Sequence, residues 1–97
     1  MNALTDEDIA RALAEVLEPT PGNLVPIPAV HGAALAHLGV TRGASFRNIK
    51  DVLRAAGVRV ASAEPGADHH AYDVALTPDA QSAELERQTR RLRRPSR

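Results

Sequence analysis

Cysteine is absent from this chain of 97 residues, and aromatic residues are almost absent. Without cysteine, the protein has no disulfide bond, no thiolate metal ligand and no thiol nucleophile. Phe46 and Tyr72 are the only aromatic side chains, so the core must consist of Leu, Val, Ile and Ala. Such a core favours closely packed helices over a large ligand pocket.

Long apolar runs are also missing. No stretch is long enough to cross a bilayer, and Met1 is followed by polar and acidic residues instead of the basic and apolar segments of a signal peptide. We therefore expect a cytoplasmic protein that makes no membrane contact and has the length of one domain. Lysine is rare as well, with one Lys against eleven Arg, a bias that is typical of GC-rich bacterial genomes.

The net charge is zero, but the charges are sorted into blocks along the chain. The net charge is −4 over residues 1–41, +4 over 42–59, −6 over 60–86 and +6 over 87–97. Sorting of this kind produces a local positive field that attracts a polyanion, even on a neutral protein. Alternatively, the arginines pair with the acidic residues in the folded chain, and no such field arises.

Residues 5–17 have the pattern of an amphipathic helix. Thr5 occupies the N-cap position, and Asp8, three residues later, completes a capping box. Four prolines in the following segment, residues 18–28, exclude a helix there. We expect that segment to contain a short edge strand, formed by Leu24, Val25 and Ile27.

Residues 35–60 are the most informative part of the chain. A second helix is expected over residues 28–38, with Gly39 in the left-handed conformation at its C-terminal end. A third helix, with basic residues on its exposed side, is expected over about residues 44–56. Its buried face recurs at helical spacing and consists of Phe46, Ile49, Val52, Leu53 and Ala56.

A β-hairpin is expected after the third helix, because apolar residues begin to alternate with polar ones. The predicted strands cover residues 58–63 and 70–76, and the turn between them contains Glu64 and Asp68. The side chains predicted to face inward are Val58, Val60, Tyr72, Val74 and Leu76.

A last helix is expected over residues 78–92, with a threonine as its N-cap. Leu85 and Leu92, seven residues apart, are its only large apolar side chains. That stripe is thin for packing on the protein's own core, and it would form half of a weak homodimer seam. We therefore divide the chain into a folded domain, residues 1–77, and a C-terminal helix with an arginine-rich tail, residues 78–97.

The run Leu38-Gly39-Val40-Thr41-Arg42, followed by apolar residues at helical spacing and by Gly57-Val58, resembles the recognition segment of bacterial winged helix-turn-helix regulators. The apolar residues that match are Phe46, Ile49 and Leu53. The resemblance covers roughly residues 5–76, and it departs from the family by about one extra residue near Gly43.

The resemblance implies an α+β winged helix-turn-helix fold, with a three-helix core, a β-hairpin wing and a C-terminal helix. It implies double-stranded DNA as the partner and a role as a small transcriptional regulator or as a plasmid- or phage-type accessory factor. A weaker similarity is to the winged recognition domains at the ends of bacterial and plasmid DNA translocases. The alternative is a winged-helix module for protein–protein contacts, with its acidic wing and first helix as the partner surface.

If the third helix enters the major groove, Arg47 and Asn48 near its N-terminal end would read bases, arginine pairing with guanine and asparagine with adenine. Lys50 and Arg54 would follow the DNA backbone or the groove. The remaining predicted DNA contacts, at the helix start and at the base of the wing, come from Thr41, Arg42, Ser45 and Arg59.

The C-terminal tail is a separate basic cluster without an aromatic residue, so it would contact a nucleic acid backbone and not its bases. It suits non-specific DNA phosphate contacts, RNA or an anionic partner, and it is also where a longer protein would continue. Its arginines are Arg87, Arg90, Arg91, Arg93, Arg94 and Arg97.

Nothing in the sequence indicates catalysis or a bound metal. His31 and His37 are six residues apart and do not share a helix face, and His69 and His70 are adjacent and point opposite ways in a strand. Neither a nucleophile elbow nor a glycine-rich phosphate loop is found. We therefore expect no enzyme activity, no catalytic residue, no metal, no cofactor and no small-molecule substrate.

Overall fold

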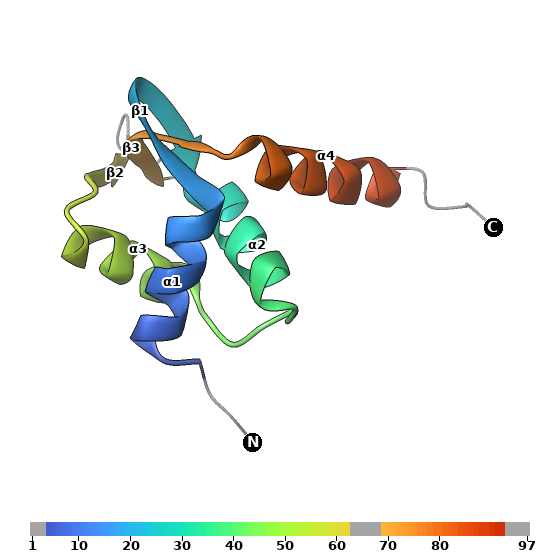
Figure 1. The fold of residues 1–97 in the computed structure, drawn as a ribbon, viewed down its shortest axis with the longest axis horizontal. Helices are drawn as coiled ribbons and strands as arrows, with labels where there is room; N and C mark the ends of the chain where they lie inside the picture. Colours follow the sequence, from blue (N-terminus) through green and yellow to red (C-terminus); the bar gives the residue numbers. More distant parts are fainter. Residues whose placement is uncertain (1–3, 63–68, 93–97) are drawn as a thin grey trace.

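A computed structural model describes the chain over residues 4–62 and 69–92, with the backbone alone for residues 84 and 87–92 (Figure 1). These residues form an α+β structure. Its helices are α1 (Asp6–Val16), α2 (Ile27–Leu38), α3 (Phe46–Ala55) and α4 (Pro78–Leu92). Its strands are β1 (Leu17–Pro26), β2 (Val60–Ser62) and β3 (His69–Leu76).

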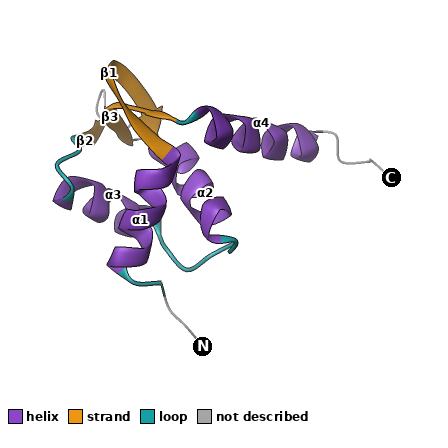
Figure 2. Cartoon of the chain, viewed as in Figure 1, coloured by secondary structure: helices purple, strands orange, loops and turns teal. Residues whose placement is uncertain are grey.

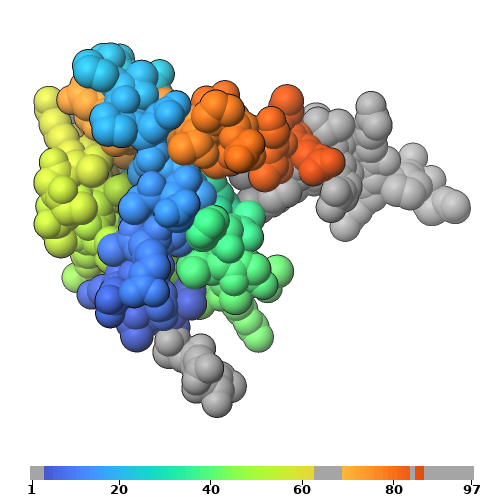
Figure 3. Space-filling model, in the orientation of Figure 1, coloured from blue at the N-terminus to red at the C-terminus, as the bar shows by residue number. Residues whose placement is uncertain are grey.

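The three strands form one antiparallel sheet in the order β1-β3-β2. The sheet lies at one end of the group formed by α1, α2 and α3 (Figure 2), and α1 lies between the other two helices in the space-filling view (Figure 3). The core between these helices and the sheet is aliphatic, as the composition predicts. Its largest fully buried side chains are Ile27, Val30, Ile49 and Leu53.

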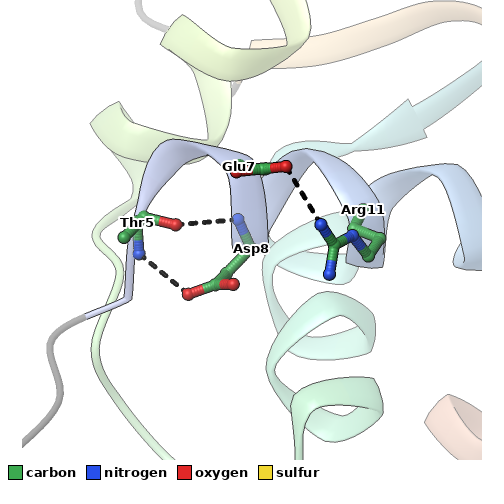
Figure 4. A network of polar contacts seen from close by, with 4 residues as sticks. All are labelled: Thr5, Glu7, Asp8 and Arg11. Carbon is green, nitrogen blue, oxygen red and sulfur yellow. Dashed lines mark hydrogen bonds and ion pairs between the residues drawn. The ribbon is translucent and has the colours of Figure 1, made fainter.

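α1 begins where the sequence predicts. The Thr5 hydroxyl accepts the N–H of Asp8 at 3.1 Å, and the Asp8 carboxylate accepts the N–H of Thr5 at 3.1 Å (Figure 4). This reciprocal capping box satisfies backbone N–H groups that have no partner within the helix. On the exposed side of the same helix, Arg11 pairs with Glu7 at 3.0 Å (Figure 4). The buried stripe consists of Ile9, Ala12, Leu13 and Val16.

β1 is longer than the short strand that the sequence predicted. It pairs with β3 along its length, apart from an irregularity between Pro19 and Leu24. The sheet order places this proline-rich strand at an edge, where missing N–H donors are tolerated. Ile27 was expected to continue the strand, but it is the first residue of α2 and is buried, because Pro26 ends the strand and acts as the N-cap.

The irregularity in the sheet is a bulge built around Asp73, whose φ is +64°. Its Oδ1 accepts the N–H of Gly22 at 2.8 Å, and the side-chain amide of Asn23 donates to the Val74 carbonyl at 2.7 Å. The bulge therefore joins residues that are 51 positions apart in the chain.

The inward face of β3 differs from the prediction. Ala71 is fully buried, whereas Tyr72, which was predicted to face inward, is half-buried. Strict alternation breaks at Asp73, because a bulge shifts which residues share a face of the sheet. On β2, Val60 is buried as predicted, but the strand begins there, two residues later than expected.

α2 ends as predicted, with Gly39 in the left-handed conformation at φ +75°. The N–H of Val40 returns to the carbonyl of Leu35 at 3.0 Å, which satisfies one of the carbonyls left open at the helix end. α3 begins at Phe46, one to two residues after the predicted start, and its last helical residue is Ala55.

α4 begins after Thr77, whose hydroxyl accepts the N–H of Ala80 at 3.3 Å, so the predicted N-cap is confirmed. The first turn of α4 packs on the core, where Ala80 is buried, and the later turns extend away from the sheet (Figure 1). Its Leu85 is 64% exposed. None of the described helices, α4 included, is long and apolar enough to span a membrane.

Candidate nucleic-acid interface

The loop of residues 39–45 positions α3 against α2. Gly43 has a φ of +128°, and a Cβ at this position would lie 3.1 Å from Cδ1 of Leu4, so the loop passes close to the segment before α1. On the other side, Nε2 of His31 on α2 donates to the carbonyl oxygen of Ala44 at 2.8 Å. These contacts with two separate segments fix the loop that leads into α3.

Thr41 and Arg42, two of the predicted phosphate contacts, lie exposed in this loop. Arg42 comes four positions before the first residue of α3. Both side chains are therefore near the start of α3 in sequence and accessible from solvent.

Ser45 and Asn48 form the N-terminal cap of α3. The Ser45 hydroxyl accepts the Asn48 N–H at 3.1 Å, and Oδ1 of Asn48 accepts the N–H of Ser45 at 3.0 Å. The Ser45 hydroxyl also donates to this Oδ1 at 3.0 Å. Because a bidentate contact with adenine needs that same oxygen, Asn48 would have to exchange a capping bond for a base. The spacing of Ser45 and Asn48 is a sequence signal for this cap, which the assignment of both residues to DNA does not take into account.

The outer face of α3 is basic. Arg47, Lys50 and Arg54 lie on this side with Asp51, and Ile49, Val52 and Leu53 are buried on the opposite side. Nε of Arg47 lies 3.9 Å from Oδ2 of Asp51, and the two side chains are 88% and 60% exposed. An ion pair this long and this exposed is weak, so the Arg47 guanidinium stays available to an anion.

Two arginines near the base of the hairpin are held in place. Nη2 of Arg54 donates to the Val60 carbonyl at 3.2 Å. The Arg59 guanidinium carbon lies 4.7 Å from the ring centroid of Tyr72, and the backbone N–H of Tyr72 donates to the Arg59 carbonyl at 3.0 Å. The cation–π contact orients the Arg59 side chain. Helical and strand periodicity could not show this contact, because it depends on which strands pair.

Phe46 was predicted to be buried, but it is 48% exposed. It is the first residue of α3, and no earlier turn of that helix covers it. Its ring meets the ring of His31 edge to face, with centroids 4.8 Å apart and an interplanar angle of 82°. Ala56, also predicted to be buried, is exposed just beyond the end of α3. Helical spacing predicts a buried face from Phe46 to Ala56, but α3 contacts the core only over Ile49, Val52 and Leu53.

Several predicted features lie outside the described residues. They include the acidic turn with Glu64 and Asp68, and the last three tail arginines, Arg93, Arg94 and Arg97. Arg87, Arg90 and Arg91 belong to the backbone of α4, and their side chains are not described.

The described His, Asp and Glu side chains do not form a cluster that could bind a metal ion. Among the described side chains, those of residues 4–62, 69–83, 85 and 86, no three His, Asp or Glu are placed to hold a metal ion, and no polar or charged one is buried. His31 contacts the Ala44 carbonyl and the Phe46 ring.

Comparison with known proteins returns no match to this chain, either among protein-family models, among curated proteins or among solved structures. Cations on an exposed helix face and at the base of a neighbouring hairpin are suited to bind phosphates.

Proposed function

We propose that this protein is a winged helix-turn-helix protein that binds double-stranded DNA with α3 in the major groove. The element order α1-β1-α2-α3-β2-β3 supports the assignment, because a helix pair is followed directly by a hairpin that returns to an antiparallel sheet. β2 and β3 would form the wing.

The observation that carries the proposal is the charge on the outer face of α3 and at the hairpin base. Arg47, Lys50, Arg54 and Arg59 occupy this surface, and Asp51 is the one acidic residue between positions 42 and 59. The major groove admits an α-helix, and each cation near a phosphate releases condensed counterions, which favours binding.

The anchoring of Arg54 and Arg59 adds to this surface. Arg54 is held by the Val60 carbonyl and Arg59 by the Tyr72 ring. Because these guanidinium groups are already oriented, they lose less side-chain entropy when they contact phosphates. We assign Arg54 and Arg59 to the DNA backbone.

Arg47 is the base reader that the geometry favours. It is 88% exposed, it lies in the first turn of α3, and its pair with Asp51 is weak. Arg42, exposed in the preceding loop, would bind phosphate. Ser45 and Asn48 are engaged in capping, so we give them a supporting role at the helix start.

The test is fluorescence anisotropy of a labelled random-sequence duplex with the full chain at several salt concentrations. We expect the logarithm of affinity to fall with the logarithm of salt by several units, about 0.9 for each phosphate contacted. Arg42→Ala should reduce this slope by about 1. Asp51→Asn should bind more tightly, because it removes the one acidic residue between positions 42 and 59.

Arg47→Ala and Arg11→Ala form a matched pair. Each removes an exposed helical arginine that pairs with an acid four residues away on its own helix. On a selected target duplex, we expect Arg47→Ala to lose affinity by the equivalent of about 1–3 kcal/mol. Arg11→Ala, on the acidic helix α1, should bind as the unaltered chain does.

Replacement of all six tail arginines (Arg87, Arg90, Arg91, Arg93, Arg94 and Arg97) by Gln in the full chain measures the share of the tail. If binding disappears in this variant and is unaffected by Arg42→Ala and Arg47→Ala, α3 is not the DNA-binding element. The alternative, a winged-helix module that contacts a protein through its acidic wing and first helix, would then replace the proposal.

In the cell, we propose a cytoplasmic role as a small bacterial transcriptional regulator or as a plasmid- or phage-type accessory factor. A homodimer joined through α4 fits this role, because Leu85 is exposed on a helix whose later turns extend away from the sheet (Figure 1). In this proposal, the arginine-rich tail adds non-specific phosphate contacts.

A further inference from the structure

An exposed phenyl ring lies at the beginning of α3. Of the described residues, the exposed large apolar side chains are Leu24, Val40, Phe46 and Leu85, and only Phe46 belongs to α3. Phe46 is 48% exposed, whereas Ile49, one turn later, has no exposed surface. The ring therefore lies at the rim of the core, with one side open to solvent.

The ring is oriented without being covered. His31 contacts it edge to face at 4.8 Å between centroids, and His31 is itself fixed by its hydrogen bond of 2.8 Å to the Ala44 carbonyl. Edge-to-face contacts set the plane of an aromatic ring. An apolar group held in this way loses little conformational freedom when a ligand covers its open side.

The surroundings of the ring are basic. Arg47 is the next residue, Lys50 lies one helical turn further on the same flank, and residues 42–50 contain three basic residues and no acidic one. The open side of Phe46 thus borders the cationic surface proposed to face DNA.

We infer that Phe46 determines sequence specificity by contacting the C5-methyl group of a thymine in the major groove, an inference that rests on the proposed function. The N-terminal residues of a recognition helix are those that meet base edges. Phenylalanine has no hydrogen-bonding group with which to read a base, and the thymine methyl is the apolar feature that the major groove offers to it.

The experiment begins with selection of tight-binding duplexes from a random library by the full chain. Each thymine of the best duplex is then replaced singly by deoxyuridine, which lacks only the C5-methyl group, and affinity is measured by anisotropy at one fixed salt concentration. At one or two adjacent positions we expect a loss of about fourfold, the effect of one methyl group that is no longer buried.

The same pair of duplexes is then measured with three variants. Phe46→Ala should bind the thymine and deoxyuridine duplexes equally. Leu24→Ala, which truncates an exposed apolar side chain on β1, should keep the fourfold difference. Phe46→Leu, which retains apolar bulk, should keep part of the difference.

The outcomes separate this inference from the proposed function. If no duplex is bound in a salt-dependent way, the proposed function itself fails. If duplexes are bound but no position of the unaltered chain is sensitive to deoxyuridine, or if Phe46→Ala keeps the sensitivity, DNA binding stands and the role of Phe46 is overturned. Deoxyuridine sensitivity is measured on the unaltered chain, and its absence alone overturns the role of Phe46. The test therefore does not depend on how well a variant folds.

Discussion

Arg47 and Arg54 share one face of α3, but their guanidinium groups have different partners. Nη2 of Arg54 donates to the Val60 carbonyl at 3.2 Å, and Arg47 has an exposed pair with Asp51 at 3.9 Å. We expect Arg54→Ala to lower the free energy of unfolding by about 1 kcal/mol, because it removes a link between α3 and β2. Arg47→Ala should change it by less than about 0.5 kcal/mol. Urea denaturation measures both values.

The two substitutions should also differ in DNA binding. Arg54→Ala removes a proposed phosphate contact and should reduce the salt slope by about 1, whereas Arg47→Ala removes the proposed base contact and should weaken binding to the selected target duplex. Arg11→Ala controls for the loss of an exposed helical arginine elsewhere. If Arg47→Ala destabilised the protein as much as Arg54→Ala, the hydrogen bond to Val60 would not be what distinguishes the two residues.

Between the strands, the bulge around Asp73 holds β1 against β3. Asp73 adopts a φ of +64°, which is costly for most residues other than Gly, Asn and Asp, and its carboxylate accepts the N–H of Gly22 at 2.8 Å. Asp73→Ala loses the hydrogen bond and keeps the unfavourable backbone conformation. We expect the free energy of unfolding to fall by about 1–3 kcal/mol.

Asp73→Asn is the matched control, because asparagine tolerates the same backbone conformation and its amide oxygen accepts the same hydrogen bond. Its unfolding free energy should lie close to that of the unaltered chain. Equal destabilisation by Ala and Asn would mean that the charge of the carboxylate, and not its hydrogen bond, stabilises the bulge.

The helices were predictable because their ends are set by neighbouring residues. Thr5 and Asp8 cap α1, Gly39 ends α2 and Thr77 caps α4, and each of these contacts spans only a few positions. Local capping chemistry can be read from sequence spacing. The boundaries agree with the prediction to within two residues for all of these helices.

The strands and the details of the site depend on distant partners. The bulge at Asp73 joins segments 51 positions apart, and it decides that Ala71 and not Tyr72 is buried. The cationic positions on α3 followed from periodicity, and they are exposed or half-exposed. Periodicity does not predict strand pairing or the placement of loops. It therefore could not predict that Tyr72 orients Arg59 or that His31 orients the exposed Phe46.

At the scale of the whole molecule, the charges lie on different elements. Asp6, Glu7 and Asp8 form the first turn of α1, and the basic residues between positions 42 and 59 lie on α3, in the loop before it and at the hairpin base. Asp51 is the one acidic residue among the basic residues between positions 42 and 59. Under the proposed function, this basic segment of a neutral protein would steer its association with DNA at low salt.

α4 is the element through which we propose that two copies assemble. Leu85 is 64% exposed on α4, and Leu92 follows seven residues later, the repeat of a helical dimer seam. In a two-fold dimer, each α3 would meet one half-site, and the half-sites would lie about 34–36 Å apart, one turn of DNA.

We expect Leu85→Glu to separate the two copies, because the seam would have to bury a charge at its centre. Size-exclusion chromatography with light scattering across a range of protein concentrations should show a dimer for the unaltered chain and a monomer for Leu85→Glu. Leu24→Glu makes the same change at an exposed leucine of β1 and should remain dimeric.

On a duplex with two half-sites, the monomeric variant should lose tight binding but keep its affinity for one half-site, because α3 is unchanged. An unaltered chain that is monomeric at every concentration and binds one half-site as tightly as two would remove α4 from the DNA-binding proposal and leave α3 in it.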